Sequence, residues 1–194
     1  MKKLIGLTGK TGSGKSTVSA YLKERGAFII DGDIVARQVL IENTKLIEEL
    51  ENKFHGVLNP DGTLNRKALA AKAFSTPENT ALLNSVMHPA INSYIEREAN
   101  TAFEKYDVVI VDAAAIIESG FADRCDALVV VTAPVEIRLE RIMARDSISR
   151  EDALIRINGQ KEEDFYLSRA DYVIHNFEPY DTCIQVEDMI KNLF

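Results

Sequence analysis

Gly9-Lys10-Thr11-Gly12-Ser13-Gly14-Lys15-Ser16 stands directly after the apolar run Leu4-Ile5-Gly6-Leu7 and directly before a helical pattern. The stretch fits G-x-x-x-x-G-K-[ST], the phosphate-binding loop that joins a strand to a helix. Its glycines let the backbone turn N–H groups toward an anion at a helix N-terminus, whose dipole also favours negative charge. The alternative is a glycine-rich turn that matches by chance. The order of strand, loop and helix favours the phosphate-binding loop.

The residues at the end of this loop have expected roles toward a bound triphosphate. Lys15 is expected to bridge the β- and γ-phosphates as a point charge, and the Ser16 hydroxyl is expected to bind Mg²⁺. Thr17 is expected near the α-phosphate. The loop residues predicted to bind the nucleotide are Gly12, Ser13, Gly14, Lys15, Ser16 and Thr17.

Composition and charge limit the class of protein. The chain has 194 residues, 46% of them hydrophobic, which is enough for one sizeable core, so we expect a single domain over residues 1–194. The net charge of −7 argues against general nucleic-acid binding, which needs a basic face. Every apolar run is much shorter than the roughly 20 residues that span a bilayer, so no membrane association is expected.

The two cysteines, Cys125 and Cys183, lie far apart in the sequence and form no CxxC pair. They are expected to be small buried hydrophobic residues rather than a disulfide or a metal pair. This cysteine usage, together with the lack of an export or membrane segment, predicts a cytoplasmic protein.

Short apolar runs alternate with helical patterns, which predicts a three-layer α/β fold with a five-stranded parallel sheet. After the run before the loop, the expected strands cover residues 27–31, 107–112, 127–131 and 172–174. Helices are expected over 16–25, 34–40, 44–54, from Arg66 onward, after Thr76-Pro77, and at the C-terminal end. Pro89 is expected to end the helix that starts at Pro77, with a separate helix over 90–104.

Aspartates follow two of the expected strands, at the sheet edge where parallel sheets bind ligands. Asp33 comes just after the strand at 27–31 and could accept the proton of an alcohol during phosphoryl transfer. The alternative for Asp31 and Asp33 is ordinary turn and N-cap chemistry. Asp112 ends the strand at 107–112 and could hold Mg²⁺ through water, with a plain strand-end aspartate as the alternative.

An arginine stripe marks the helical pattern at 134–146. Arg138, Arg141 and Arg145 fall within about 60° of helical arc. Such a stripe in an acidic chain suits a clamp on the transferring phosphoryl group, and a solvated charged face is the alternative. The apolar residues expected to face the core on another side of this helix are Val135, Leu139, Ile142 and Met143.

The features that accompany the loop favour a small-molecule kinase. The chain has no N-K-x-D segment of the kind that specifies guanine, and no separate glutamate or glutamine for water activation is evident. A kinase acting on another nucleoside, nucleotide or alcohol, and a slowly hydrolysing nucleotide-dependent switch, are the competing interpretations. The sequence offers no visible effector segment for a switch.

The order and spacing of motifs along the whole chain resemble the dephospho-coenzyme A kinase family. The stretches that carry the resemblance are residues 5–16, 31–33 with Arg37, 61–64 with Arg66, His88-Pro89, Glu118, 141–146, Gln160, and 170–174 with Asn176. The resemblance implies ATP-dependent phosphorylation of the ribose 3′-hydroxyl of dephospho-CoA, the last step of coenzyme A synthesis. It also implies a nucleotide-kinase-like fold with a helical acceptor-binding region at roughly 33–105 and a lid at roughly 134–168.

The resemblance also implies roles for individual residues. Asp33 would be the general base and Asn176 a neighbour of the ATP adenine, while Lys15, Arg141 and Arg145 would act on the phosphates. The residues expected to contact the acceptor are Arg37, Arg66, His88 and Glu118. ATP and Mg²⁺ are the expected cofactors, and no obligate protein partner is visible in the sequence.

Three stretches depart from the usual family pattern. Lys10-Thr11 stands where the family commonly has Gly-Ile, Ala114-Ala115-Ile116 replaces Pro-Leu-Leu, and Phe177-Glu178 replaces Asn-Gly. None of these changes removes a residue expected to act in catalysis.

Overall fold

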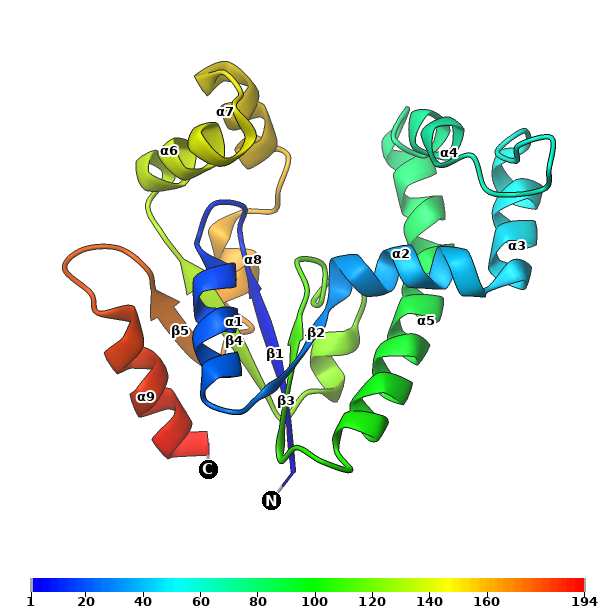
Figure 1. Cartoon of the computed structure of the whole chain (residues 1–194). Coiled ribbons are helices and arrows are strands. Elements are labelled where there is room, and N and C mark those ends of the chain that lie inside the picture. The colour runs from blue at the N-terminus through cyan, green and yellow to red at the C-terminus, as the bar shows by residue number, and fades with distance from the viewer. Residues whose placement is uncertain (1, 194) are drawn as a thin grey trace. The chain divides into compact units, whose positions relative to one another are not determined.

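The computed structural model describes residues 2–193, which contain a five-stranded parallel sheet in the order β2-β3-β1-β4-β5 (Figure 1). The strands are β1 (Lys3–Gly9), β2 (Phe28–Asp31), β3 (Val108–Asp112), β4 (Ala127–Thr132) and β5 (Tyr172–His175). The predicted α/β class with a five-stranded parallel sheet is confirmed.

Helices occupy most of the chain between these strands. They are α1 (Lys15–Glu24), α2 (Gly32–Glu42), α3 (Thr44–Phe54), α4 (Arg66–Ala73), α5 (Pro77–Ala102), α6 (Val135–Asp146), α7 (Arg150–Asn158), α8 (Glu163–Leu167) and α9 (Thr182–Leu193), with a 3₁₀ turn at Phe121–Arg124. No helix within residues 2–193 is both long and apolar enough to cross a membrane. The chain forms two compact units, Met1–Ile30 with Ala99–Phe194, and Asp31–Glu98.

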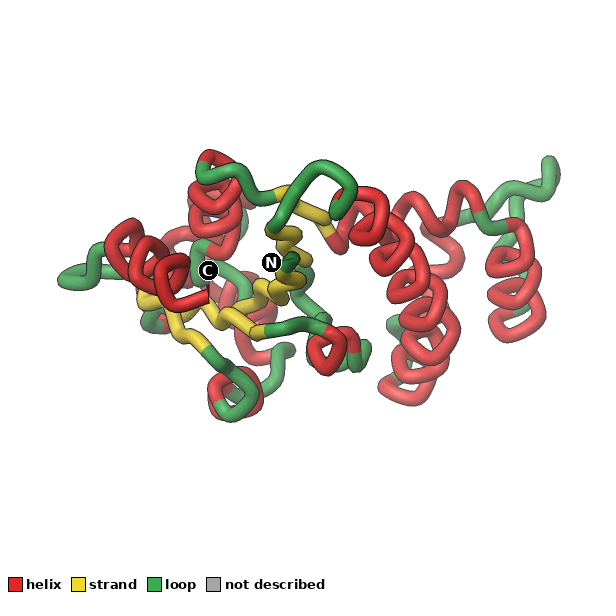
Figure 2. The backbone as a smooth tube through the Cα atoms, turned by 90° about the horizontal axis from the view of Figure 1, so that it is seen from below, coloured by secondary structure: helices red, strands yellow, loops and turns green. Residues whose placement is uncertain are grey.

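The central strand β1 fixes the position of the loop that follows it. β1 pairs with β3 on one side and with β4 on the other, and its side chains Ile5 and Leu7 are fully buried. Val18 and Leu22 of α1 belong to the same core cluster, as do residues of α9. Figure 2 shows strands running through this unit with helices to either side. A strand buried on both faces holds its C-terminal end firmly, so the loop after Gly9 starts from a rigid support.

The pair of helices α6 and α7 packs around a small core of its own. Leu139 and Ile142 of α6 are buried against Ala153 and Ile157 of α7. Val135 is 46% exposed, so the expectation that it faces the core is wrong. It is the first residue of α6, ahead of the turns whose apolar face meets α7.

Side-chain caps define the helix starts in the second unit. The Asp31 carboxylate accepts hydrogen bonds from the N–H groups of Asp33 and Ile34, so α2 begins at Gly32, two residues earlier than expected. Asn43 caps α3 and Asn65 caps α4 in the same way. The N-cap alternative is therefore confirmed for Asp31, and it leaves the Asp33 carboxylate out of the cap.

Helix α5 contradicts the expectation that Pro89 ends it. The helix runs unbroken from Pro77 to Ala102 with Pro89 inside it. Proline removes one backbone donor and crowds the preceding turn, but the buried residues Val86 before it and Ile95 after it keep both halves packed. Tertiary burial therefore outweighs the local cost of the proline.

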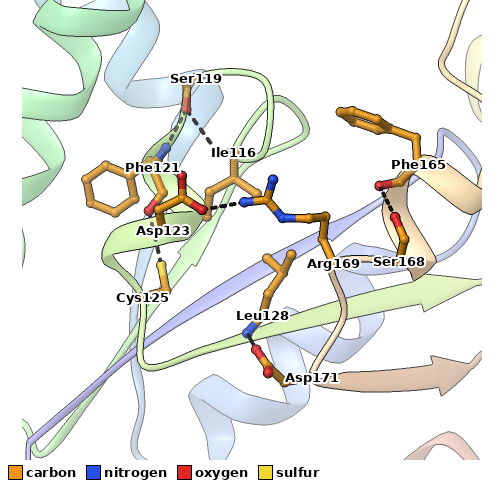
Figure 3. Close-up of polar contacts among 10 residues, drawn as sticks. All are labelled: Ile116, Ser119, Phe121, Asp123, Cys125, Leu128, Phe165, Ser168, Arg169 and Asp171. Carbon is orange, nitrogen blue, oxygen red and sulfur yellow. Dashed lines mark hydrogen bonds and ion pairs between the residues drawn. The ribbon is translucent and has the colours of Figure 1, made fainter.

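The connection from β3 to β4 is held by local hydrogen bonds and by an ion pair (Figure 3). Asp123 pairs with Arg169, and the Ser119 hydroxyl donates to the Ile116 carbonyl at 3.1 Å. Cys125 is partly buried, and burial raises the pKa of its thiol to about 12, so the thiol stays protonated at neutral pH. Cys183 is exposed, so the expectation that both cysteines are buried is wrong for Cys183.

Replacing Pro89 by alanine is expected to stabilise the protein. Pro89 is exposed, so Pro89→Ala leaves no cavity, and it restores a backbone donor in the interior of α5. We expect the free energy of unfolding to rise by about 1–2 kcal/mol, as part of the helix gain is offset by a more flexible unfolded chain. Pro77→Ala, at the exposed first position of the same helix, is the matched control and is expected to give no gain. Denaturant unfolding of both variants checks this, and equal effects would contradict it.

Candidate active site

The loop between β1 and α1 has the backbone of an anion-binding turn. Gly12 and Gly14 have φ of 79° and 88°, in the left-handed region that favours glycine. Gly14 precedes the first residue of α1, Lys15, and the Ser13 N–H donates to the Lys10 carbonyl at 3.0 Å. The first free N–H groups of a helix and its dipole attract phosphate at such a position.

Lys15 and Asp112 form an ion pair beside this loop. Asp112 is the last residue of β3 and pairs in register with Leu7 of β1, which brings its carboxylate to the strand end that carries the loop. The side chains of Lys15 and Asp112 are 24% and 12% exposed, so the pair is largely screened from water. The structure thus brings together the cation expected on the phosphates and the carboxylate expected near the metal.

The donors at this position suit a magnesium ion that arrives with the nucleotide. Ser16 offers a hydroxyl on an exposed residue and Asp112 a carboxylate, both of them hard oxygen donors. Residues 2–193 contain no group of three histidine, cysteine, aspartate or glutamate side chains that could hold a metal ion. Mg²⁺ commonly takes one or two protein ligands and completes its shell with phosphate oxygens and water, which fits these two donors.

Arg141 and Asn176 reach the loop from two different elements. The Arg141 guanidinium donates to the carbonyls of Gly12, Ser13 and Asn176 at 3.3, 3.1 and 2.8 Å. The Asn176 side-chain amide donates to the Ser13 carbonyl at 3.0 Å, and its oxygen accepts from the Thr182 hydroxyl. Both residues, predicted as phosphate and adenine neighbours, therefore lie against the phosphate-binding loop.

The other two arginines of the stripe behave differently from Arg141. Arg145 forms two hydrogen bonds with Asp146, whose pKa is lowered by Arg145 and by Arg156. Arg138 is 2% exposed and its Nε donates to the Thr11 carbonyl at 2.9 Å. A solvated face is therefore wrong for Arg138, and its guanidinium is held by the loop backbone rather than left open as a clamp.

Glu118 lies in the first unit, in the connection between β3 and β4. Burial, followed by the negative charge of Glu118, raises the pKa of the Tyr166 hydroxyl, so Glu118 lies close to that hydroxyl. Its predicted contact with an acceptor stays a prediction.

Three of the residues predicted to act on the acceptor line one cavity in the second unit. Asp33, Arg37 and Arg66 border a cavity of about 600 Å³, and the Arg66 guanidinium donates to the Arg37 carbonyl at 3.5 Å. The rest of the lining is apolar and comes from α2, α4, α5 and the residue after α4: Ala36, Leu40, Leu69, Ala70, Phe74, Leu83 and Met87. A charged rim over apolar walls suits an anionic ligand with a large uncharged part.

His88 is next to this lining but is not part of it. Its side chain is half-buried on α5, and burial lowers its pKa, so the ring is neutral at pH 7. A neutral imidazole can exchange hydrogen bonds with a ligand but adds no positive charge to the cavity.

The sequence interpretation missed two features of the site. The apolar walls of the cavity come from three separate segments, which no single pattern connects. The Gln160 side-chain oxygen accepts the Thr11 N–H at 2.8 Å. The sequence indicates Gln160 only as part of the family resemblance, which assigns it no role.

The strand order, the glycine turn before α1 and the Lys15–Asp112 pair define a P-loop protein that binds a nucleoside triphosphate. The model of the family "Dephospho-CoA kinase" matches residues 3–180. The chain belongs to the dephospho-CoA kinase family.

Relatives and solved structures agree with this family. A dephospho-CoA kinase of Corynebacterium jeikeium is 44% identical over 173 residues, covering 89% of each chain. The TT1252 structure from Thermus thermophilus has a TM-score of 0.79 at 31% identity, covering 99% of this chain and 96% of that one. A dephospho-CoA kinase structure from Campylobacter jejuni has a TM-score of 0.72 at 27% identity, covering 100% and 98%.

Gly14→Ala is expected to cost far more stability than Gly26→Ala. Both glycines have positive φ, 88° and 92°, so an alanine at either costs about 1–2 kcal/mol of backbone strain. A Cβ at Gly14 would also clash with the Asn176 side chain, whereas a Cβ at Gly26 meets nothing within 4 Å. Denaturant unfolding should show at least twice the loss for Gly14→Ala, and equal losses would mean that the Asn176 contact carries no weight.

Proposed function

We propose that this chain transfers the γ-phosphoryl group of ATP to the ribose 3′-hydroxyl of dephospho-CoA. The observation that carries the proposal is the cavity of the second unit, where Asp33, Arg37 and Arg66 stand over apolar walls. Membership of the dephospho-CoA kinase family supports the same substrate. Its product is coenzyme A, so the reaction is the final step of coenzyme A synthesis.

The donor nucleotide binds at the loop before α1. Its phosphates bind at the N-terminal end of α1, where the glycine turn meets the helix, and Lys15 exchanges its pairing with Asp112 for the β- and γ-phosphate oxygens. Mg²⁺, held by Ser16 and through water by Asp112, would neutralise charge on the phosphate oxygens. Arg141, which donates to the loop carbonyls of Gly12 and Ser13, adds positive charge near the transferred group, and Arg145, one turn further along α6, is a second candidate for this role.

The acceptor binds in the cavity of the second unit, which is the acceptor-binding region of the fold. Dephospho-CoA carries a diphosphate and a long uncharged arm, and these match the two kinds of lining. Arg37 and Arg66 pair with the diphosphate, while Leu40, Phe74 and their neighbours receive the uncharged part. His88 and Glu118 are secondary candidates for contacts with the acceptor.

The chemical step moves one phosphoryl group and one proton. The ribose 3′-oxygen forms a bond to the γ-phosphorus as the bond to the β-phosphate oxygen breaks and ADP leaves. Asp33 receives the hydroxyl proton. The carboxylate is exposed and takes no part in the cap of α2, which Asp31 supplies, so it is open to an acceptor in the cavity. In this proposal, the lid expected at roughly 134–168 consists of helices α6 to α8.

An acceptor panel tests the function directly. We expect ADP formation from Mg-ATP with dephospho-CoA, and none with coenzyme A, whose 3′-oxygen is already phosphorylated. Selective turnover of AMP or another alcohol would show that the acceptor is not dephospho-CoA. ADP release that no acceptor stimulates would favour a nucleotide-dependent switch instead.

Asp33→Asn is expected to lower kcat by at least about a hundredfold, because the base is lost while the shape of the site is kept. Asp31→Asn is the matched control, since asparagine caps a helix about as well as aspartate does. The control is expected to keep kcat within about twofold. Full turnover by a folded Asp33→Asn enzyme that binds both substrates would show that another group is the base.

Arg66→Gln is expected to raise the KM for dephospho-CoA about tenfold, because a charge-assisted contact to the diphosphate is lost. The KM for ATP should not change. Lys67→Gln removes a positive charge from the next exposed residue of α4, outside the cavity lining, and serves as control. An equal rise in KM for Lys67→Gln would mean that Arg66 acts through the overall positive charge and makes no specific contact with the diphosphate.

A further inference from the structure

Thr11 in the phosphate-binding loop has both of its backbone polar groups bound by side chains from the lid segment. The Arg138 Nε of α6 donates to the Thr11 carbonyl at 2.9 Å. The Gln160 side-chain oxygen, two residues after α7, accepts the Thr11 N–H at 2.8 Å. The Arg138 guanidinium also donates to that Gln160 oxygen at 3.4 Å. These three residues therefore form a closed hydrogen-bonded ring.

The ring is fixed in place by burial. Arg138 is 2% exposed and is among the largest fully buried side chains. Burial lowers the pKa of its guanidinium, and the nearby Glu163 and Tyr166 partly restore it. A buried cation is costly unless its hydrogen bonds are satisfied, so moving Arg138 away from Thr11 would be unfavourable.

The backbone of α6 also packs directly on the loop at this point. A Cβ on Gly12 would stand 2.7 Å from the Arg138 carbonyl oxygen and 3.0 Å from its Cα. The glycine at position 12 is thus required by the approach of α6 as well as by its φ of 79°. Arg138 therefore contacts both residues: its side chain binds Thr11, and its backbone packs against Gly12.

We propose that Arg138 and Gln160 are positioning residues, which hold Thr11 so that the loop has its phosphate-binding shape before the nucleotide arrives. A loop residue whose N–H and carbonyl are both bound cannot rotate its peptide groups. Less ordering is then left to occur on binding, which strengthens affinity for the triphosphate. Arg141, one turn further along α6, can exchange its carbonyl contacts for phosphate, whereas Arg138 stays with Thr11.

The inference rests on the proposed function only in taking ATP as the ligand of the loop. It is tested by binding of a fluorescent ATP analogue without any acceptor, so a wrong acceptor would leave the result unchanged. Gln160→Met keeps the length of the side chain and removes its oxygen. We expect about tenfold weaker nucleotide binding, the effect of about one lost hydrogen bond, in a chain that still folds with a melting temperature lowered by about 2–4 °C.

Two further variants separate positioning from general disturbance. Gln160→Glu keeps an oxygen acceptor for Thr11 and Arg138, so it should bind nucleotide more tightly than Gln160→Met. Arg150→Gln is the matched control, since Arg150 lies on α7, is exposed and pairs with Glu136 of α6. Its nucleotide affinity should equal that of the native chain.

Amide hydrogen exchange distinguishes local positioning of Thr11 from a general effect on stability, because it measures the exchange rate of each amide separately. In Gln160→Met the Thr11 amide should exchange faster, while the Ser13 amide, bonded to the Lys10 carbonyl, should not. Arg138→Lys, which keeps the charge and loses Nε, should weaken nucleotide binding in the same direction. Native affinity in folded Gln160→Met, or an equal loss in Arg150→Gln, would overturn the proposal.

Discussion

The turn from β1 into α1 is the constraint on which the rest of the first unit depends. β1 is buried between β3 and β4, so its end at Gly9 cannot move, and α1 must start within a few residues of it. Glycines with positive φ at positions 12 and 14 make that turn possible. The resulting backbone leaves carbonyls of residues 11 to 13 that need partners, and these partners come from distant parts of the chain.

Those partners explain how segments far apart in the sequence become one site. Arg138 and Gln160 bind Thr11, Arg141 binds the next two carbonyls, and Asn176 binds Ser13. A buried backbone group without a partner is unfavourable, so each contact contributes to the fold as well as to the site. Arginine suits this role because its planar fork can reach several oxygens at once.

In the second unit, the start of α2 also joins a structural role and a chemical one. Asp31 supplies the cap that starts α2, and Asp33, two residues later, is left exposed beside a cavity with arginines at its rim. The two aspartates look alike in the sequence, Asp31-Gly32-Asp33. Their different positions at the start of one helix give one a structural role and make the other available for chemistry.

The sequence by itself determined the α/β class, the five strands and the loop, because these depend on local periodicity and on a motif with fixed spacing. It predicted α3 to the residue, but it ended a helix at Pro89, where burial of Val86 and Ile95 keeps α5 whole. It also grouped Arg138 with Arg141 and Arg145, since all three share a helical face. Only the tertiary structure separated them, because burial and the partner carbonyls of a loop more than a hundred residues away decide what each guanidinium can bind.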